Sequence, residues 1–265
     1  MTPSSGKTDW KSHARSFDRV AETYDRCRPS YPPELVEALI ERTGLPAGGR
    51  ILEVGSGTGK ATILFARRGY AIHCLEPGAN LAAVAARNLE DFPRVSFEET
   101  TFEDWPVQAG AYDLLVSAQA FHWTAEETRF SKAAAALKEG GALALFWNYY
   151  PPTQGEIYRE LDEIYRRFFP DQPGGGVPLD EYIRYWQDQI RCTPFFSGLD
   201  TWQHPWSETA STAEYIGLLN TYSDHLTLPE PVQKELFQTV GELIDRHGGR
   251  IEKPYMATLF TARKV

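Results

Sequence analysis

Short apolar runs alternate with amphipathic segments over the first 150 residues of the chain. The runs have the length and composition of buried parallel strands, and the segments between them carry apolar residues at helical spacing. Strands are expected at residues 51–54, 71–76, 94–99, 111–117 and 142–147, and helices at 34–43, 61–68, 79–89 and 125–137. This alternation predicts an α/β fold with a doubly wound, mostly parallel sheet.

The alternation of strands and helices stops after residue 150. Helical periodicity continues at residues 156–169, 179–191, 212–222 and 231–247, while 199–206 and 251–264 have the pattern of strands. A further helix is expected near the N-terminus, at residues 13–28. The second half of the chain is therefore expected to add two strands and a group of helices to the core.

The strand at residues 51–54 ends in a glycine-rich loop, and a helix follows at once. Glycines let a ligand approach the bare backbone, and the helix start offers unpaired N–H groups. A phosphate-binding loop would require glycine at Val54 and Ser or Thr at Ala61, so that pattern fails twice. A dinucleotide fingerprint would require glycine at Lys60 and fails once. From spacing alone, a nicotinamide-dependent oxidoreductase is therefore the runner-up.

The pattern Glu53-x-Gly55-x-Gly57-x-Gly59 resembles the first motif of class I S-adenosylmethionine-dependent methyltransferases. The resemblance implies a Rossmann-like methyltransferase fold with S-adenosyl-L-methionine as the cofactor. It places the glycine loop, including Ser56, below the methionine part of the cofactor. It gives Glu53 the role of organising the loop.

A carboxylate stands at the end of the second predicted strand. Glu76, which is followed by Pro77, lies 19 residues after Gly57. This spacing is that of the acidic residue that hydrogen-bonds the ribose hydroxyls in dinucleotide-binding folds. We therefore expect Glu76 to bind the ribose of the cofactor.

The N-terminal region contains the string Phe17-Asp-Arg-Val-Ala-Glu-Thr-Tyr24, followed by Arg28-Pro-Ser-Tyr31-Pro. This string is similar to the N-terminal lid of a methyltransferase subgroup that includes trans-aconitate methyltransferase. By that resemblance, Tyr24 and Arg28 are expected to lie over the cofactor and help to enclose it.

The loop after the third strand lies against the adenine in this family, and it corresponds here to Thr101, Phe102 and Glu103. Thr101 takes a place that an acidic residue holds more often. The contact to the adenine amino group therefore stays open between Thr101, Glu103 and water. Phe102 is expected to be an apolar neighbour of the base.

The fourth predicted strand ends in Gln119-Ala-Phe-His122-Trp123, which matches the same subgroup. Ligands bind at the carboxyl ends of strands in doubly wound sheets, so this segment is expected to face the transferred methyl group, with Gln119 beside the cofactor. His122 is the candidate catalytic residue, as a base or as a donor that holds an acidic acceptor, and a structural role is the alternative. Trp123, Asn148 and Tyr149 are expected to line the acceptor pocket together with His122.

The sheet of this family ends in an antiparallel hairpin, to which residues 199–206 and 255–263 are assigned. The expected architecture is a seven-stranded, mostly parallel sheet with a helical cap over the strand tips. Its parts are an N-terminal lid segment (1–32), a cofactor-binding α/β core (33–150), a helical cap inserted around the sixth strand (151–250) and the final strand (251–265).

Composition narrows the range of partners. The formal net charge of −9 argues against nonspecific nucleic-acid binding. The apolar runs are too short to span a membrane, and no secretion signal is visible. The three cysteines are odd in number and lack metal-clip spacing, so neither a disulfide framework nor a metal site is expected. A cytoplasmic protein fits best, and its oligomeric state is unknown.

The predicted function is methyl transfer from S-adenosylmethionine to a small-molecule acceptor, such as a carboxylate or another oxygen nucleophile. In-line displacement on a sulfonium mainly requires positioning and exclusion of water, so no catalytic triad is needed. The alternatives are a macromolecular acceptor such as tRNA, a nicotinamide-dependent oxidoreductase, or a non-catalytic protein that retains the cofactor pocket.

Overall fold

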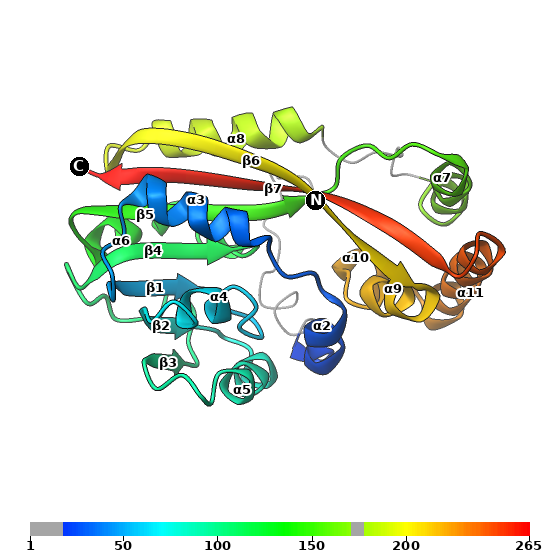
Figure 1. Ribbon diagram of the computed structural model, residues 1–265, viewed down its shortest axis with the longest axis horizontal. Coiled ribbons are helices and arrows are strands. Elements are labelled where there is room, and N and C mark those ends of the chain that lie inside the picture. Colours follow the sequence, from blue (N-terminus) through cyan, green and yellow to red (C-terminus); the bar gives the residue numbers. More distant parts are fainter. Residues whose placement is uncertain (1–17, 171–177) are drawn as a thin grey trace.

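A computed structural model describes residues 18–170 and 178–265, and the seven strands of these residues form one sheet (Figure 1). The order across the sheet is β3-β2-β1-β4-β5-β7-β6. The first five strands are parallel, and β7 is antiparallel to both β5 and β6. The bounds are β1 (Arg50–Val54), β2 (Ala71–Leu75), β3 (Val95–Glu98), β4 (Tyr112–Ala118), β5 (Leu137–Tyr149), β6 (Phe196–Ser211) and β7 (Arg250–Lys264). The predicted fold class is confirmed.

Helices connect the strands and follow the predicted periodicity. Their bounds are α2 (Ala21–Cys27), α3 (Pro33–Thr43), α4 (Thr62–Ala66), α5 (Ala79–Asn88), α6 (Arg129–Ala136), α7 (Glu156–Phe168), α8 (Leu179–Arg191), α9 (Thr212–Leu219), α10 (Ser223–Leu226) and α11 (Glu230–Arg246). A short 3₁₀ helix, η1 (Phe121–Trp123), follows β4.

Both faces of the sheet are covered, as the doubly wound prediction requires. Ile51 of β1 belongs to a buried cluster with Phe65 of α4 and with side chains of α3. Leu52, the next residue along β1, belongs to a second buried cluster with Trp186 of α8 and with side chains of α6. Successive side chains of a strand point to opposite faces, so the two clusters lie on opposite sides of the sheet.

The ribbon of β6 and β7 carries the cap. The sequence predicts the sixth strand over residues 199–206, whereas β6 extends to Ser211 and stays paired with β7 as far as Arg250. The distal half of β6 is polar, so the alternation that predicts a half-buried strand is absent there. Helix α9 begins where β6 ends, and α11 ends just before β7 begins (Figure 1).

The cap has a hydrophobic cluster of its own. Leu219 of α9, Leu236 and Leu243 of α11 and Ile251 of β7 are buried together, with the side chains of α7 packed against them. These residues belong to neither cluster on the sheet. Within the described ranges, no helix is both long and apolar enough to cross a membrane.

Helix α8 departs from the expectation that the helices between residues 151 and 250 cap the strand tips. Its residues Tyr182, Trp186 and Ile190 are spaced by four and share one helical face, which is buried in the cluster that contains Leu52. Trp186 stacks on Trp147 of β5 with ring centroids 4.6 Å apart. Because its apolar face packs on the sheet, α8 covers one face of the core and is not part of a cap over the strand tips.

Helix α2 is held against α5. Ala21 of α2 packs on Leu81 of α5. Asp18 Oδ1 accepts hydrogen bonds from the backbone N–H groups of Asn80 and Leu81, at distances of 2.7 and 3.1 Å. These bonds satisfy donors that a helix start leaves unpaired. The N-terminal part of the helix predicted over residues 13–28 lies outside the described residues, since these begin at residue 18.

Candidate functional site

A cavity opens at the carboxyl ends of β1, β2 and β4, where doubly wound sheets bind ligands. The space that the centre of a water molecule can occupy in it is about 130 Å³. A second cavity adjoins it, with about 40 Å³ of such space. The two linings share Tyr24, Gly55, Gly57, Ala118 and Gln119. The glycine loop is therefore part of both cavities.

Gly55, Gly57 and Gly59 of this loop all have left-handed backbone conformations, and the space around the first two differs. Gly55 has a φ of 72°, and a Cβ atom there would come within 2.4 Å of the Cβ of Ala120. Gly57 has a φ of 56°, and a Cβ there would meet no atom within 4 Å. Gly55 thus permits close packing against the segment after β4, while the position of Gly57 faces open space in the cavity lining.

Glu76 holds the glycine loop and also lines the larger cavity. Its Oε2 accepts a hydrogen bond from Gly57 N at 2.8 Å, and its Oε1 accepts one from Gly78 N at 2.9 Å. The residue is only 6% exposed. Burial raises the pKa of Glu76 to about 7, against the opposing effect of the two N–H donors. A buried carboxylate therefore lies at the cavity wall with little solvation of its own.

Glu53 lies at the base of the loop and is fully buried. Neither of its carboxyl oxygens has a hydrogen-bond partner among the described residues. Burial raises the pKa of Glu53 to about 8. Burial outweighs the opposing effect of the Thr62 hydroxyl, so the neutral form of the carboxyl group is favoured at neutral pH.

These two carboxyl groups predict how stability depends on pH. Because their pKa values are raised from the ordinary 4.5, the folded protein binds more protons than the unfolded chain between about pH 4.5 and 8. Their contribution to stability is complete at the acidic end of this window and is lost as the pH rises through it. We expect the ligand-free wild type to lose a few kcal/mol more than Glu53→Gln between about pH 5 and 8 in urea unfolding. Equal losses in the two proteins would contradict the assignment.

Gln119, at the end of β4, has a φ of 58°, and it is the non-glycine residue with a left-handed backbone in the described ranges. Such conformations cost energy and concentrate at functional sites. The side chain lines both cavities, and its Nε2 donates to the backbone oxygen of Asn148 at 3.4 Å. The strained residue thus turns the chain from β4 towards His122.

One contact determines which ring nitrogen of His122 carries the proton. Trp147 Nε1 lies 3.3 Å from His122 Nδ1. An indole nitrogen can only donate, so Nδ1 is the acceptor and the proton of the neutral ring is on Nε2. Burial lowers the pKa of His122 to about 3, which keeps the ring neutral. Nε2 is shielded from solvent and has no partner among the described residues, so an N–H donor is left unused.

Comparison with known proteins assigns the family. Residues 51–141 match the methyltransferase domain family. A malonyl-[acyl-carrier protein] O-methyltransferase of Geobacter sulfurreducens is 32% identical over 192 residues, covering 69% of this chain and 68% of the relative. The chain belongs to the S-adenosylmethionine-dependent methyltransferases.

Further relatives of this methyltransferase span more of its length. An uncharacterized methyltransferase of Mycobacterium tuberculosis is 29% identical over 88% of this chain and 86% of the relative. A trans-aconitate 2-methyltransferase of Variovorax paradoxus is 26% identical over 72% of this chain and 73% of the relative. The predicted class and the predicted resemblance to the trans-aconitate methyltransferase subgroup are confirmed, so the oxidoreductase alternative is set aside.

The fold is shared with a solved structure named as a type II methyltransferase from Anaeromyxobacter dehalogenans. The TM-score is 0.62 at 22% identity, over 89% of this chain and 96% of that chain. At this level of identity the likeness shows the fold alone.

Most residues predicted to bind the cofactor line the two cavities of this methyltransferase, namely Tyr24, Arg28, Gly55, Ser56, Gly57, Glu76, Pro77, Thr101, Phe102, Glu103 and Gln119. Glu53 and Gly59 do not belong to either lining. Glu53 is buried below the loop, and a Cβ at Gly59 would come within 2.7 Å of Leu89 Cδ1. These two residues support the loop from behind.

The polar side chains of the loop after β3 form hydrogen bonds within the loop and to Ala125. The Oγ1 of Thr101 donates to Asp104 Oδ2 and accepts from Asp104 N, both at 3.0 Å. The Oε1 of Glu103 accepts from Ala125 N at 2.6 Å. Phe102 lines the cavity and its ring stacks on Trp105. The loop therefore presents an apolar ring to the cavity, while the hydroxyl of Thr101 and one carboxyl oxygen of Glu103 are already engaged.

The four residues predicted to bind the acceptor fall into different environments. Trp123 lines the larger cavity, whereas His122, Asn148 and Tyr149 line neither. Asn148 Nδ2 donates to Ser30 O at 2.9 Å, and its Oδ1 accepts from Trp206 Nε1 at 3.1 Å, so both ends of the amide are used. The hydroxyl of Tyr149 is buried without a partner in the described chain. These contacts favour a structural role for Asn148.

Several lining residues were not predicted. The larger cavity also includes Thr100, Ala118, Ala120 and Thr124, and the smaller one includes Lys60. The small residues at the end of β4 contribute backbone and methyl groups, which leave no chemical signal in a sequence. The rule that ligands bind beyond the carboxyl ends of strands placed this segment at the site, although neither Ala118 nor Ala120 was singled out.

Proposed function

We propose that this methyltransferase binds S-adenosyl-L-methionine in the two joined cavities and transfers its methyl group to a carboxylate of a small-molecule acceptor. The ribose hydroxyls would donate to Glu76, and the adenine would lie against Phe102. The methionine part would run along Gly55 and Gly57 into the smaller cavity. The cofactor supplies a methyl group that is already activated on a sulfonium.

The unused Nε2–H of His122 is the observation that carries the choice of acceptor. A neutral imidazole with its proton on Nε2 cannot accept a proton there, and its Nδ1 is occupied by Trp147. His122 is therefore a hydrogen-bond donor and not a general base. An alcohol or ammonium nucleophile would require a base, whereas a carboxylate is already deprotonated at neutral pH.

The reaction balances without a proton acceptor. A carboxylate oxygen forms a bond to the methyl carbon while the bond from that carbon to sulfur breaks, and the electron pair of that bond stays on sulfur. The anionic oxygen and the cationic sulfonium both become neutral, which gives a methyl ester and S-adenosylhomocysteine. The chain's part is to hold the carboxylate in line. His122 Nε2–H and the hydroxyl of Tyr149 are two of the unpartnered buried donors, and the acceptor would have to reach past the two cavities to meet them, because neither residue lines a cavity.

Two relatives support an acceptor of this kind. One is named as a trans-aconitate 2-methyltransferase and the other as a malonyl-[acyl-carrier protein] O-methyltransferase. Aconitate and malonyl groups are carboxylic acids or their derivatives. The formal net charge of −9 also disfavours the alternative of a tRNA acceptor.

A product analysis tests the carboxylate. The purified protein is incubated with methyl-labelled S-adenosylmethionine and a panel of di- and tricarboxylates, beside the matching amides and amines. The proposal predicts labelled products from the carboxylates only, and the label should be released as methanol by mild base, because esters hydrolyse under these conditions. Base-stable label on an amine would contradict it.

Changing the donor at residue 122 is expected to separate the two roles of the histidine. His122→Gln can retain an N–H near the position of Nε2, so we expect it to keep about a tenth of the wild-type kcat/KM. His122→Phe should lose about a hundredfold or more, as expected for a lost hydrogen bond to a charged group. Steady-state kinetics measure both. A wild-type rate that rises with a pKa between 6 and 7, and a pH-independent rate in His122→Phe, would show a general base instead.

A further inference from the structure

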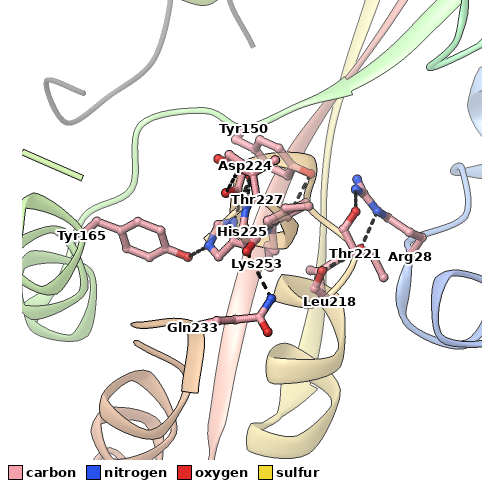
Figure 2. Close-up of polar contacts among 11 residues, drawn as sticks. Arg28, Tyr150, Tyr165, Leu218, Thr221, Asp224, His225, Thr227, Gln233 and Lys253 are labelled. Atoms are coloured by element: carbon pink, nitrogen blue, oxygen red, sulfur yellow. Dashed lines mark hydrogen bonds and ion pairs between the residues drawn. The ribbon is translucent and has the colours of Figure 1, made fainter. Parts of the chain in front are cut away.

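Two cations lie against one tyrosine ring beside the cofactor cavities. The guanidinium carbon of Arg28 is 4.6 Å from the ring centroid of Tyr222, and the Nζ of Lys253 is 5.0 Å from the same centroid. Arg28 follows α2 and lines the smaller cavity. Lys253 lies near the start of β7, in the part that is paired with the end of β6. Figure 2 shows Arg28 and Lys253 near Thr221, which lies between α9 and α10.

Neither of these cations is held in an ion pair with another described residue. Neither Arg28 nor Lys253 forms an ion pair with a carboxylate anywhere in the described ranges. Burial first, and then the charge of Arg28, lower the pKa of Lys253 to about 7. Glu208, the cross-strand register partner of Lys253 on β6, acts in the opposite direction but forms no ion pair with it. Burying two neighbouring cations that form no ion pair is costly.

The residues around the Tyr222 ring also leave hydrogen-bond donors without a partner among the described residues. Lys253 Nζ donates to the hydroxyl of Tyr222 at 2.5 Å, and that hydroxyl donates to the hydroxyl of Tyr150 at 3.0 Å. Tyr150 is 49% exposed, so the chain of hydroxyls ends at solvent with one O–H free to donate. Arg28 uses Nε and Nη2 on Thr221, which leaves Nη1 without a hydrogen bond to any described residue.

Hydrogen bonds of His225 hold the segment that carries Tyr222 in place. His225 is buried, with Nδ1 2.9 Å from Asp224 Oδ1 and Nε2 2.9 Å from the hydroxyl of Tyr165 on α7 (Figure 2). Arg28 ties the same segment to α2 through Thr221. The donors are therefore held in place before any ligand arrives, as an efficient binding site requires.

We propose that Arg28, Lys253, Tyr150 and Tyr222 form an anion subsite that holds a second, non-reacting carboxylate or phosphate group of the acceptor. This inference rests on the proposed function and adds that the acceptor carries at least two anionic groups. An anion there would form a direct ion pair with both cations and accept hydrogen bonds from the free donors of Arg28 and Tyr150. The carboxylate of the cofactor is the competing occupant. Arg28 lines the smaller cavity, but the acceptor is favoured because the other three members, Lys253, Tyr150 and Tyr222, line neither cavity.

The test uses three variants and two titrations. Lys253→Met removes the cap cation, and Tyr150→Phe removes the outer hydroxyl from a half-exposed position. Lys234→Met is the matched control, since Lys234 is an exposed cap lysine paired with Glu230. Each protein is first titrated with S-adenosylhomocysteine in a calorimeter. The S-adenosylhomocysteine-saturated protein is then titrated with citrate and, separately, with inorganic phosphate.

The proposal predicts that citrate or phosphate affinity falls at least tenfold in Lys253→Met and severalfold in Tyr150→Phe, with Lys234→Met unchanged. S-adenosylhomocysteine affinity should stay the same in all three variants. Lys253→Met should melt no lower than the wild type, because it removes a charge that lacks a counterion. Equal anion affinities in all proteins would overturn the subsite.

A second result would also overturn it. If Lys253→Met lost affinity for S-adenosylhomocysteine but kept its affinity for 5′-methylthioadenosine, which lacks the carboxylate, the occupant would be the carboxylate of the cofactor. A wild type that does not bind S-adenosylhomocysteine would instead overturn the proposed function.

Discussion

Replacing Glu76 with alanine is expected to weaken binding of S-adenosylmethionine by about a hundredfold or more. The carboxylate lies in the wall of the larger cavity, where it can accept two hydrogen bonds from the ribose hydroxyls. Hydrogen bonds to a charged group contribute about 1.5–3 kcal/mol each, and every 1.4 kcal/mol is a factor of about ten in affinity. The variant also loses the two bonds that hold Gly57 N and Gly78 N. Calorimetric titration measures the change.

Two controls accompany this variant. Glu76→Gln keeps an acceptor oxygen of the same length and should fall between wild type and alanine. Glu99→Ala removes an exposed carboxylate beyond the end of the neighbouring β3 and should bind like wild type. An affinity of Glu76→Ala within threefold of wild type would show that the ribose lies elsewhere.

Placing alanine at Gly55 is expected to destabilise the protein by about 2–5 kcal/mol and to abolish activity. A left-handed conformation costs an alanine about 1–2 kcal/mol, and overpacking against a closed wall costs about 1–3 kcal/mol more. Here the added Cβ would lie 2.4 Å from the Cβ of Ala120, which has no flexible end that could move aside. Urea unfolding measures the loss of stability.

Gly57→Ala is the matched comparison in the same loop. Its backbone is also left-handed, but a Cβ there meets no protein atom within 4 Å. We expect a stability loss of only about 1–2 kcal/mol, together with a clear loss of affinity for S-adenosylmethionine, because the methyl group enters the space assigned to the cofactor. If Gly55→Ala and Gly57→Ala were equally stable, the close contact with Ala120 would not be the cause.

The fold could be predicted because its signals are local. The run before Gly55, the carboxylate at Glu76 and the alternation of strands and helices each lie within a few residues, and backbone geometry converts them directly into the sheet edge where the cavity opens. The distal half of β6 escaped prediction because its pairing with β7 is fixed by a partner far along the chain and not by its own apolar pattern.

The chemistry of the site depends on contacts that spacing does not encode. The tautomer of His122 is set by Trp147 on a different strand, and the bonds of Asn148 come from Ser30 and Trp206. Lys253 gave no signal in the sequence, since a single lysine in an alternating strand is ordinarily a solvated cation. Its role emerges only when β7 brings it to the ring of Tyr222.

The most direct test of the account is a calorimetric titration of the wild-type protein with S-adenosylmethionine, with NAD titrated in parallel. We expect one S-adenosylmethionine to bind per chain, with a dissociation constant on the order of micromolar, and NAD to give no heat. Binding of NAD, or no binding of S-adenosylmethionine at concentrations up to the millimolar range, would contradict the assignment of the glycine loop and of Glu76.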